Sequence, residues 1–318
     1  YAFMKRNKTE NSKREGPGVT GQTKSIRGAA GKSIVSRSTL RVNRIVRIPA
    51  GISSGSPILY RRYAVLFEIP SVNIRCMPPE EKNASDSVSL NRQIVGCRCC
   101  PRLIAHCREI ARIKRRSFLD WDYWGKPVPS FGDPAARLLS LGLAPAAHGA
   151  NRTGRMFTGD RSGDFLYRSL HKAGFASQTE SRHAGDGLRL TDAWITAAAH
   201  CAPPENKPSP AELRNCRPFL EREMEILGRV QVVVTLGKIA FDTWLNLLKS
   251  RGRIERVADF RFGHGVLYPE LQPALLGCYH PSQQNTSTGK LTQAMLDEVF
   301  KRAARLIRSE SVPAAPRR

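Results

Sequence analysis

Residues 142–160, GLAPAAHGANRTGRMFTGD, follow the apolar run 137–141 and form the stretch around which the rest of the chain is interpreted. The apolar run predicts a buried strand, and the loop after it carries four glycines, one proline and several polar side chains. In open α/β sheets, ligands bind outside the carboxyl ends of the strands, where such loops lie. Three later segments each follow a predicted strand and are expected at the same rim: 201–208 (CAPPENKP), 235–238 (TLGK) and 279–285 (YHPSQQN). These segments predict an enzyme whose site lies at this rim.

Four apolar runs predict buried strands, and helical patterns alternate with them. The strands are expected at 137–143, 188–199, 230–236 and 274–278, and the helices at 163–173, 209–227, 238–249 and 292–309. A further helix is expected after a cysteine-rich turn, within 90–116. The alternation predicts an α/β fold with three layers, α/β/α, and a central four-stranded, mainly parallel sheet.

The charge of the chain predicts a polyanionic partner. The 318 residues include 51 Lys and Arg against 27 Asp and Glu, a net charge of +24, with a sequence pI of about 10.4. Such a balance favours DNA or RNA as a partner, although a solvated surface with a basic tail is the alternative explanation. No apolar run reaches the roughly 18 residues of a membrane span, and no secretory signal is evident. We therefore expect a cytoplasmic monomer that associates with the nucleoid of a bacterium or archaeon, with no membrane partner.

The two ends of the chain differ in composition from its middle. Residues 1–76 carry 15 Lys and Arg against three Glu, and Gly, Ser, Thr and Arg dominate them. We expect a disordered basic extension, or a segment outside the natural product with Met77 as the true start. Residues 77–96 are expected to lead into a catalytic domain over 97–308, and the tail 309–318 is expected to be loose.

Four cysteines have the spacing of a metal site. Cys97 and Cys100 form a C-x2-C pair, and Cys201 and Cys216 form a second, wider pair. Two close thiolates and two from a distant loop suit zinc or a [4Fe–4S] cluster, and the spacing leaves the choice open. The alternative for Cys201 and Cys216 is that they are ordinary buried side chains.

The rim segments and the cysteines together resemble one family. The motifs at 142–146 (GLAPA), 151–160 (NRTGRMFTGD), 201–208 and 280–285 (HPSQQN), with the four cysteines, resemble the iron–sulfur uracil-DNA glycosylases, most closely the family 5 (type B) branch. The resemblance covers about residues 90 to 308. It implies a uracil-DNA glycosylase-like fold, a [4Fe–4S] cluster on Cys97, Cys100, Cys201 and Cys216, and hydrolysis of the N-glycosidic bond of deaminated bases in DNA, as in base-excision repair.

The resemblance also implies roles for individual residues. A flipped base needs a stacking surface, and Phe157 matches the family's stacking position. His280 matches the donor to the base carbonyl, and Asp160 is the carboxylate expected to orient the water, with Asp164 as the alternative. Asn206 is the expected partner of Asp160. The remaining base-binding candidates are Ala144, Asn285 and His148, and the DNA-binding candidates are Arg152, Arg155, Lys207, Ser282 and Gln283.

The sequence departs from the related family 4 pattern at two positions. That branch has an acid where this chain has Leu143, and reads the base with an asparagine where this chain has Ala197. We therefore expect tolerance of hypoxanthine, xanthine or etheno-cytosine besides uracil. No lysine stands out as a Schiff-base nucleophile, which favours a monofunctional glycosylase.

Two alternatives belong to other functional classes. One is a non-catalytic nucleic-acid-binding module with a structural zinc. The other is a relative that binds or covalently traps uracil, but the basic insertion typical of trapping relatives is missing between 160 and 174.

Overall fold

The computed structural model describes residues 87–309. The expectations for 1–76, for the start of the lead-in up to residue 86 and for the tail after 309 lie outside the described residues.

The sheet has six strands in the order β1-β3-β2-β4-β6-β5. Its centre consists of four parallel strands, all fully buried: β3 (Ala193–Ala197), β2 (Leu138–Gly142), β4 (Val232–Leu236) and β6 (Ala274–Cys278). The prediction of a four-stranded parallel centre is confirmed. Two antiparallel edge strands, β1 (Phe131–Gly132) and β5 (Leu267–Tyr268), were not expected. They are two residues long, too short to produce an alternating pattern.

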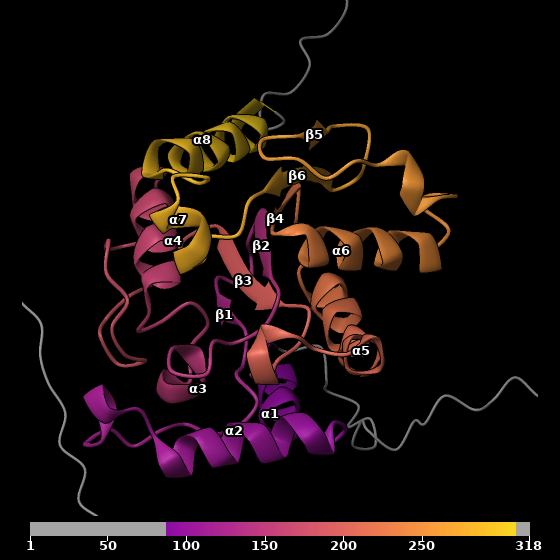
Figure 1. Ribbon diagram of the computed structural model, residues 1–318. Coiled ribbons are helices and arrows are strands. Elements are labelled where there is room, and N and C mark those ends of the chain that lie inside the picture. Colours follow the sequence, from indigo (N-terminus) through magenta and orange to yellow (C-terminus); the bar gives the residue numbers. More distant parts are fainter. Residues whose placement is uncertain (1–86, 310–318) are drawn as a thin grey trace, which may run out of the picture. The chain divides into compact units, whose positions relative to one another are not determined.

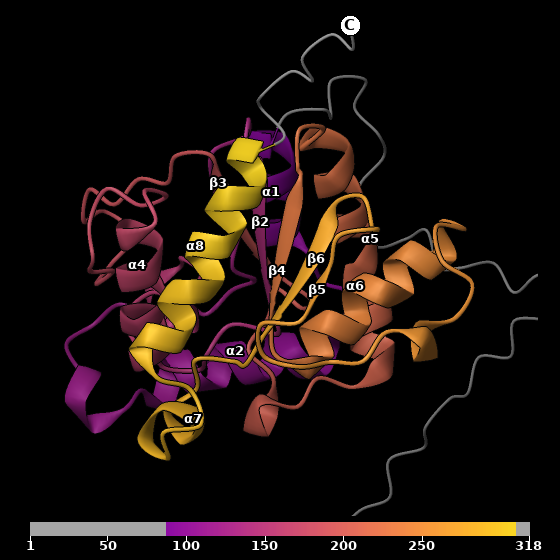
Figure 2. The same ribbon diagram turned by 90° about the horizontal axis from the view of Figure 1, so that it is seen from above.

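Helices cover both faces of the sheet. Figure 2 shows α4 (Arg161–Lys172) and α8 (Gln293–Ser309) on one face, and α5 (Pro210–Ile226) and α6 (Lys238–Ser250) on the other. Alternate strand residues point to opposite faces. Accordingly Val232 and Val234 join the core beneath α4 and α8, while Val233 packs with the core that contains α6. The three-layer prediction is confirmed. None of the helices within 87–309 combines the length and the apolarity that crossing a bilayer requires.

Two helices precede the sheet and flank the cysteine pair. Helix α1 (Ser87–Gly96) packs on α5 through Leu90, Ile94 and Phe219, and α2 (Pro101–Ile113) begins just after Cys100 with a proline in its first turn. Proline suits a first turn because its missing N–H would have no helical acceptor there. The turn between the helices thus holds Cys97 and Cys100.

The connections after the parallel strands meet at one edge of the sheet. The loop after β2 contains the short helix α3 (Ala150–Thr153), the loop after β3 contains a 3-10 turn (Pro204–Asn206), and the loop after β6 leads into α7 (Gln283–Ser287). Figure 1 shows α3 and α7 near the end of β3. Helix α5 begins with a complete capping box between Ser209 and Glu212, which ends the β3 loop sharply.

Candidate active site

The loop after β2 folds back over the strand that it leaves. A Cβ on Gly142 would lie 2.9 Å from Cε2 of Phe157, so the ring rests directly on the backbone at the strand end. The ring centroid of Phe157 is 6.1 Å from that of His280, with 34° between the ring planes. The ends of β2 and β6 therefore bring together the predicted stacking residue and the predicted base-carbonyl donor.

Phe157 has a strained backbone. Its φ is +51°, in the left-handed region that a bulky residue seldom adopts. Such strain persists only where the surroundings determine the conformation, and it concentrates at functional sites. The turn that holds the ring must therefore be fixed from outside.

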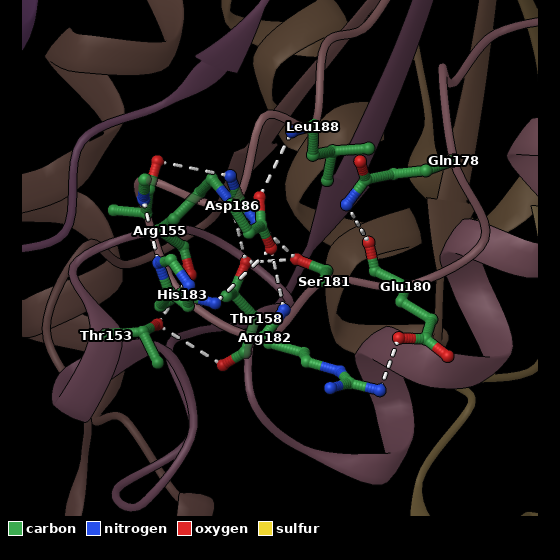
Figure 3. A network of polar contacts seen from close by, with 12 residues as sticks. Thr153, Arg155, Thr158, Gln178, Glu180, Ser181, Arg182, His183, Asp186 and Leu188 are labelled. Carbon is green, nitrogen blue, oxygen red and sulfur yellow. Dashed lines mark hydrogen bonds and ion pairs between the residues drawn. The ribbon is translucent and has the colours of Figure 1, made fainter.

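A buried ion pair fixes this turn (Figure 3). Nη2 of Arg155 donates to Oδ2 of Asp186 at 2.7 Å and to Oγ of Ser181 at 2.9 Å, and Nε donates to Oγ1 of Thr158 at 3.0 Å. The side chains of Arg155 and Asp186 are only 5% and 8% exposed. The prediction that Arg155 contacts DNA is wrong for this structure, because its guanidinium is consumed by the network that flanks Phe157.

Backbone contacts complete the support of the turn. The hydroxyl of Tyr167 donates to the carbonyl of Met156 at 2.9 Å, and the N–H of Gly159 donates to the carbonyl of Ser181 at 2.8 Å. Gly163 lets α4 approach, since a Cβ there would lie 1.9 Å from the carbonyl oxygen of Phe157. The residues on both sides of Phe157 are thus anchored independently.

Asp160 caps the helix that follows the turn. Its Oδ1 accepts from the N–H of Gly163 at 2.9 Å, at the amino end of α4. Its Oδ2 lies against Gly149, where a Cβ would be 2.0 Å away, so only glycine fits at that position. Burial raises the pKa of the Asp160 carboxyl, and the nearby Asp164 carboxylate raises it further. Asp164 itself is exposed on the first turn of α4, which leaves Asp160 as the better-held acid.

His280 is a neutral imidazole. Burial lowers its pKa to about 4, so the ring carries no charge near neutral pH. Nδ2 of Asn285 donates to the backbone carbonyl of His280 at 2.8 Å, and Ser282 caps α7 by accepting from the N–H of Asn285 at 3.3 Å. Asn285 and Ser282 thus shape the loop that carries His280, and Gln283 is exposed beside them.

The loop after β3 carries a second strained segment. Glu205 and Asn206 have φ values of +53° and +58°, two consecutive left-handed residues. Asn206 and Lys207 are exposed, and the ammonium of Lys207 lies 3.3 Å from the Glu205 carboxylate. Among the described residues no hydrogen bond joins the side chain of Asn206 to Asp160, so their partnership remains a prediction.

Arg152 is buried and not exposed to DNA. Its guanidinium carbon lies 3.9 Å from the ring centroids of both Phe118 and Trp121, and the residue is 3% exposed. The prediction that Arg152 binds DNA is therefore wrong. A motif shows that a basic residue is present but not which way it points.

The two remaining base-binding candidates lie in the same loop. Nδ1 of His148 is 3.1 Å from the hydroxyl of Tyr123, and burial lowers the pKa of His148. Ala144 is half-buried two residues beyond the end of β2.

The four cysteines of the predicted metal site lie near one another. Cys97 and Cys216 lie close enough to Cys201 to raise its pKa, and Cys97 and Cys100 do the same to Cys216, whose pKa burial raises to about 12. Nδ2 of Asn215 points to the sulfur of Cys100 at 3.5 Å. The structure thus gathers thiols from the α1–α2 turn, the β3 loop and α5.

The arrangement of these thiols was tested against both kinds of metal centre. Thiolates around one zinc, with Zn–S bonds of about 2.3 Å, would lie roughly 3.8 Å apart. Within 87–309 no three Cys, His, Asp or Glu side chains are placed to hold a single ion. A [4Fe–4S] cluster gives each thiolate its own iron and so needs wider spacing. The donor set fits the cluster better than zinc.

A cavity at the other end of the sheet is not the catalytic site. It has a volume of about 750 Å³ and is lined by Trp244, Leu248, Leu271, Arg251 and Pro273, among others, near the start of β4 and β6. It holds no carboxylate, histidine or cysteine, so the acid–base chemistry belongs to the rim.

Several residues that support the site were not predicted. Asp186, Ser181 and Tyr167 hold the Phe157 turn from positions 10 to 31 residues away, and Gly149 makes room for Asp160. No local pattern identifies them, because their roles depend on contacts between distant segments.

Comparison with known proteins agrees with this geometry. The sequence profile of the Uracil DNA glycosylase superfamily matches residues 129–304. The chain is 51% identical to a type-5 uracil-DNA glycosylase of Mycobacterium tuberculosis over 226 residues, covering 70% of this chain and 82% of that protein. It is 49% identical to that of Thermus thermophilus over 224 residues, covering 70% and 98%. Identity to a type-4 uracil-DNA glycosylase of Archaeoglobus fulgidus is 29% over 164 residues, covering 49% and 70%. This chain belongs to the uracil-DNA glycosylase superfamily, in its type-5 branch.

Proposed function

We propose that this chain hydrolyses the N-glycosidic bond between uracil and deoxyribose in DNA. The observation that carries the proposal is the meeting of Phe157 and His280, with Asp160 held three residues beyond the ring. An aromatic face, a neutral donor and a carboxylate are the three groups that this hydrolysis needs. The net charge of +24 suits a DNA substrate.

The flipped base would stack on Phe157 and receive a hydrogen bond from His280. As the C1′–N1 bond breaks, its electron pair passes to N1 of uracil and charge accumulates on the base carbonyl oxygen. A donor aimed at that oxygen is worth more in the transition state than in the ground state. Because His280 is neutral, it would act through its N–H and not through a net charge.

Asp160 would orient the attacking water and accept its proton. The water oxygen bonds to C1′ as the base departs, leaving an abasic deoxyribose and, after protonation at N1, free uracil. Burial raises the pKa of Asp160, which makes its carboxylate a stronger base. Asn206 is the proposed second contact for this water. The exposed Lys207, Ser282 and Gln283 are the proposed DNA contacts of the two neighbouring loops.

We further infer that Cys97, Cys100, Cys201 and Cys216 hold a [4Fe–4S] cluster. The gathered thiols and their spacing support the cluster over zinc. When bound, the cluster would join the α1–α2 turn to the β3 loop and α5, a structural role beside the DNA-facing Asn206 loop.

The base specificity is proposed to be broad. Ala197 ends β3 with a side chain that has no donor or acceptor, so it cannot reject bases that differ from uracil at the hydrogen-bonding edge. Hypoxanthine, xanthine and etheno-cytosine are the proposed further substrates. Without a lysine nucleophile in the site, the reaction ends at the abasic product.

The test is release of uracil from a labelled duplex by wild type, Asp160→Asn and Asp164→Asn. Asparagine caps helices as well as aspartate, so Asp160→Asn keeps the start of α4 and removes the base. Release that collapses in Asp160→Asn and persists in Asp164→Asn supports the proposal. DNA binding without release of any base by wild type would leave the non-catalytic binding module as the function.

A further inference from the structure

The segment after α2 forms a compact turn on the catalytic loop. Residues 114–121, here named the aromatic turn, contain a 3-10 turn (Arg116–Phe118) and two aromatic rings, Phe118 and Trp121. The Nζ of Lys114 donates to the carbonyl of Leu119 at 3.0 Å and closes the turn. Figure 2 shows this segment, in purple after α2, at the same end of the sheet as α7.

Arg152 joins the aromatic turn to the catalytic loop. Its guanidinium lies 3.9 Å from the centroids of Phe118 and Trp121, while Nε donates to the carbonyl of His148 at 2.8 Å and Nη2 to that of Gly159 at 2.8 Å. Its buried Nη1 has no hydrogen-bond partner in the part of the chain that the structure describes, so the ring faces offset its desolvation. The turn is thus fixed to the residue that precedes Asp160.

The outer side of the turn is basic and apolar. Arg115 and Arg116 are exposed, and within 87–309 neither guanidinium has a hydrogen-bond or ion-pair partner. Arg112, one turn earlier on α2, is by contrast paired with Glu109 at 2.7 Å. Leu119 is 55% exposed at the tip. Two unpaired guanidiniums beside an exposed leucine suit a phosphate backbone with an apolar sugar or base surface next to it.

The rigid mounting gives this surface a use in catalysis. An enzyme that acts on an extruded base must hold the flanking backbone while the base occupies the pocket. A contact made by a loosely attached loop would not fix that backbone relative to Asp160. Through Arg152, the turn and the start of α4 share one rigid support.

We propose that the aromatic turn is a DNA-binding surface, in which Arg115 and Arg116 bind phosphates of the strand flanking the flipped nucleotide and Leu119 packs on the neighbouring sugar or base. The inference rests on the proposed function, since it names the DNA surface that serves the same site. It replaces the DNA contacts that the buried Arg152 and Arg155 cannot make.

The test is the salt dependence of binding to a duplex containing 2′-fluoro-2′-deoxyuridine, whose glycosidic bond resists hydrolysis. Two lost phosphate contacts should reduce the slope of log K against log salt by about 1.8, at roughly 0.9 per contact. We expect this change in Arg115→Ala/Arg116→Ala. The matched control is Arg229→Ala/Arg308→Ala, which removes the same charge from exposed sites away from the rim and should leave the slope unchanged. Leu119→Ala should weaken binding without changing the slope, because an apolar contact releases no counterions.

A slope equal to wild type in Arg115→Ala/Arg116→Ala, with an unchanged unfolding temperature, would overturn the inference. An equal reduction in the control pair would also overturn it, since the effect would then be one of net charge. Because binding is measured without turnover, the result is independent of the proposed reaction. If wild type released no base and the slope still fell as expected, the surface would stand and the proposed function would fail.

Discussion

Replacing Asp186 by alanine should destabilise the protein strongly, because it leaves the Arg155 guanidinium buried without its counter-charge. Both side chains are less than a tenth exposed. Breaking a buried pair by removing one partner costs about 3–5 kcal/mol. Asp186 also accepts from the N–H of Arg182 at 2.8 Å and of Leu188 at 3.1 Å, but these groups lie near the surface and water can replace the carboxylate there. We therefore keep the estimate at about 3–5 kcal/mol.

The assay is chemical and thermal unfolding of wild type and variant at pH 7. At about 2–4 °C per kcal/mol for a domain of this size, the unfolding temperature should fall by roughly 6–20 °C. The matched control is Asp242→Ala, which breaks the exposed pair between Lys238 and Asp242 on α6 and should cost about 0.5 kcal/mol or less. Equal losses in the two variants would refute the argument from burial.

The pH dependence gives a second check of the same ion pair. The Arg155 guanidinium and backbone N–H groups hold the pKa of Asp186 well below its usual range, against the effect of burial. A carboxyl with a depressed folded-state pKa contributes stability above its unfolded pKa, about 3.9, and loses it as the pH falls toward the folded value. The difference between wild type and Asp186→Ala should therefore be constant from pH 7 to about 5 and narrow below about pH 4. A difference that widened on acidification would contradict the assignment.

Three further outcomes follow from the site. Gly149→Ala should lower kcat by at least about tenfold with little change in KM, since its Cβ would lie 2.0 Å from Oδ2 of Asp160 and misplace the water, and single-turnover kinetics measures this. The rate should fall on the acid side as Asp160, whose pKa is raised by burial, takes up a proton; His280→Asn should lower the rate at every pH above 5 without moving that limb, as a pH–rate profile would show. Cys216→Ser should abolish absorbance near 400 nm and reduce bound iron, measured by spectroscopy and metal analysis.

Matched variants separate these effects from general damage. Gly228→Ala adds a Cβ where nothing lies within 4 Å and should keep wild-type kinetics. Cys278→Ser changes a buried thiol in β6, outside the cysteine cluster, and should keep the iron. Zinc instead of iron in the wild-type protein would contradict the cluster, and loss of iron in both serine variants would remove the assignment of Cys216.

The sequence by itself determined the layered fold and the location of the site. Continuous apolar runs such as 230–236 predict buried parallel strands because both faces of such strands are covered, and β4 occupies that run. Ser209 and Glu212 marked the start of α5 because the capping box is local in sequence. The loops after the strands were expected at one rim because parallel strands end on the same side. The motif residues Phe157 and His280 meet there.

Only the tertiary structure decided what the charged residues of the motif do. Arg152 and Arg155 look alike in the sequence as loop arginines, but one lies between two aromatic rings and the other pairs with Asp186, 31 residues away. Exposure and pairing are properties of contacts between distant segments, and no local pattern records them. The same holds for Gly149, whose need to be glycine comes from a carboxylate eleven residues later. Local chemistry therefore predicted the elements and the candidate groups, and packing decided which groups face the pocket and which support it.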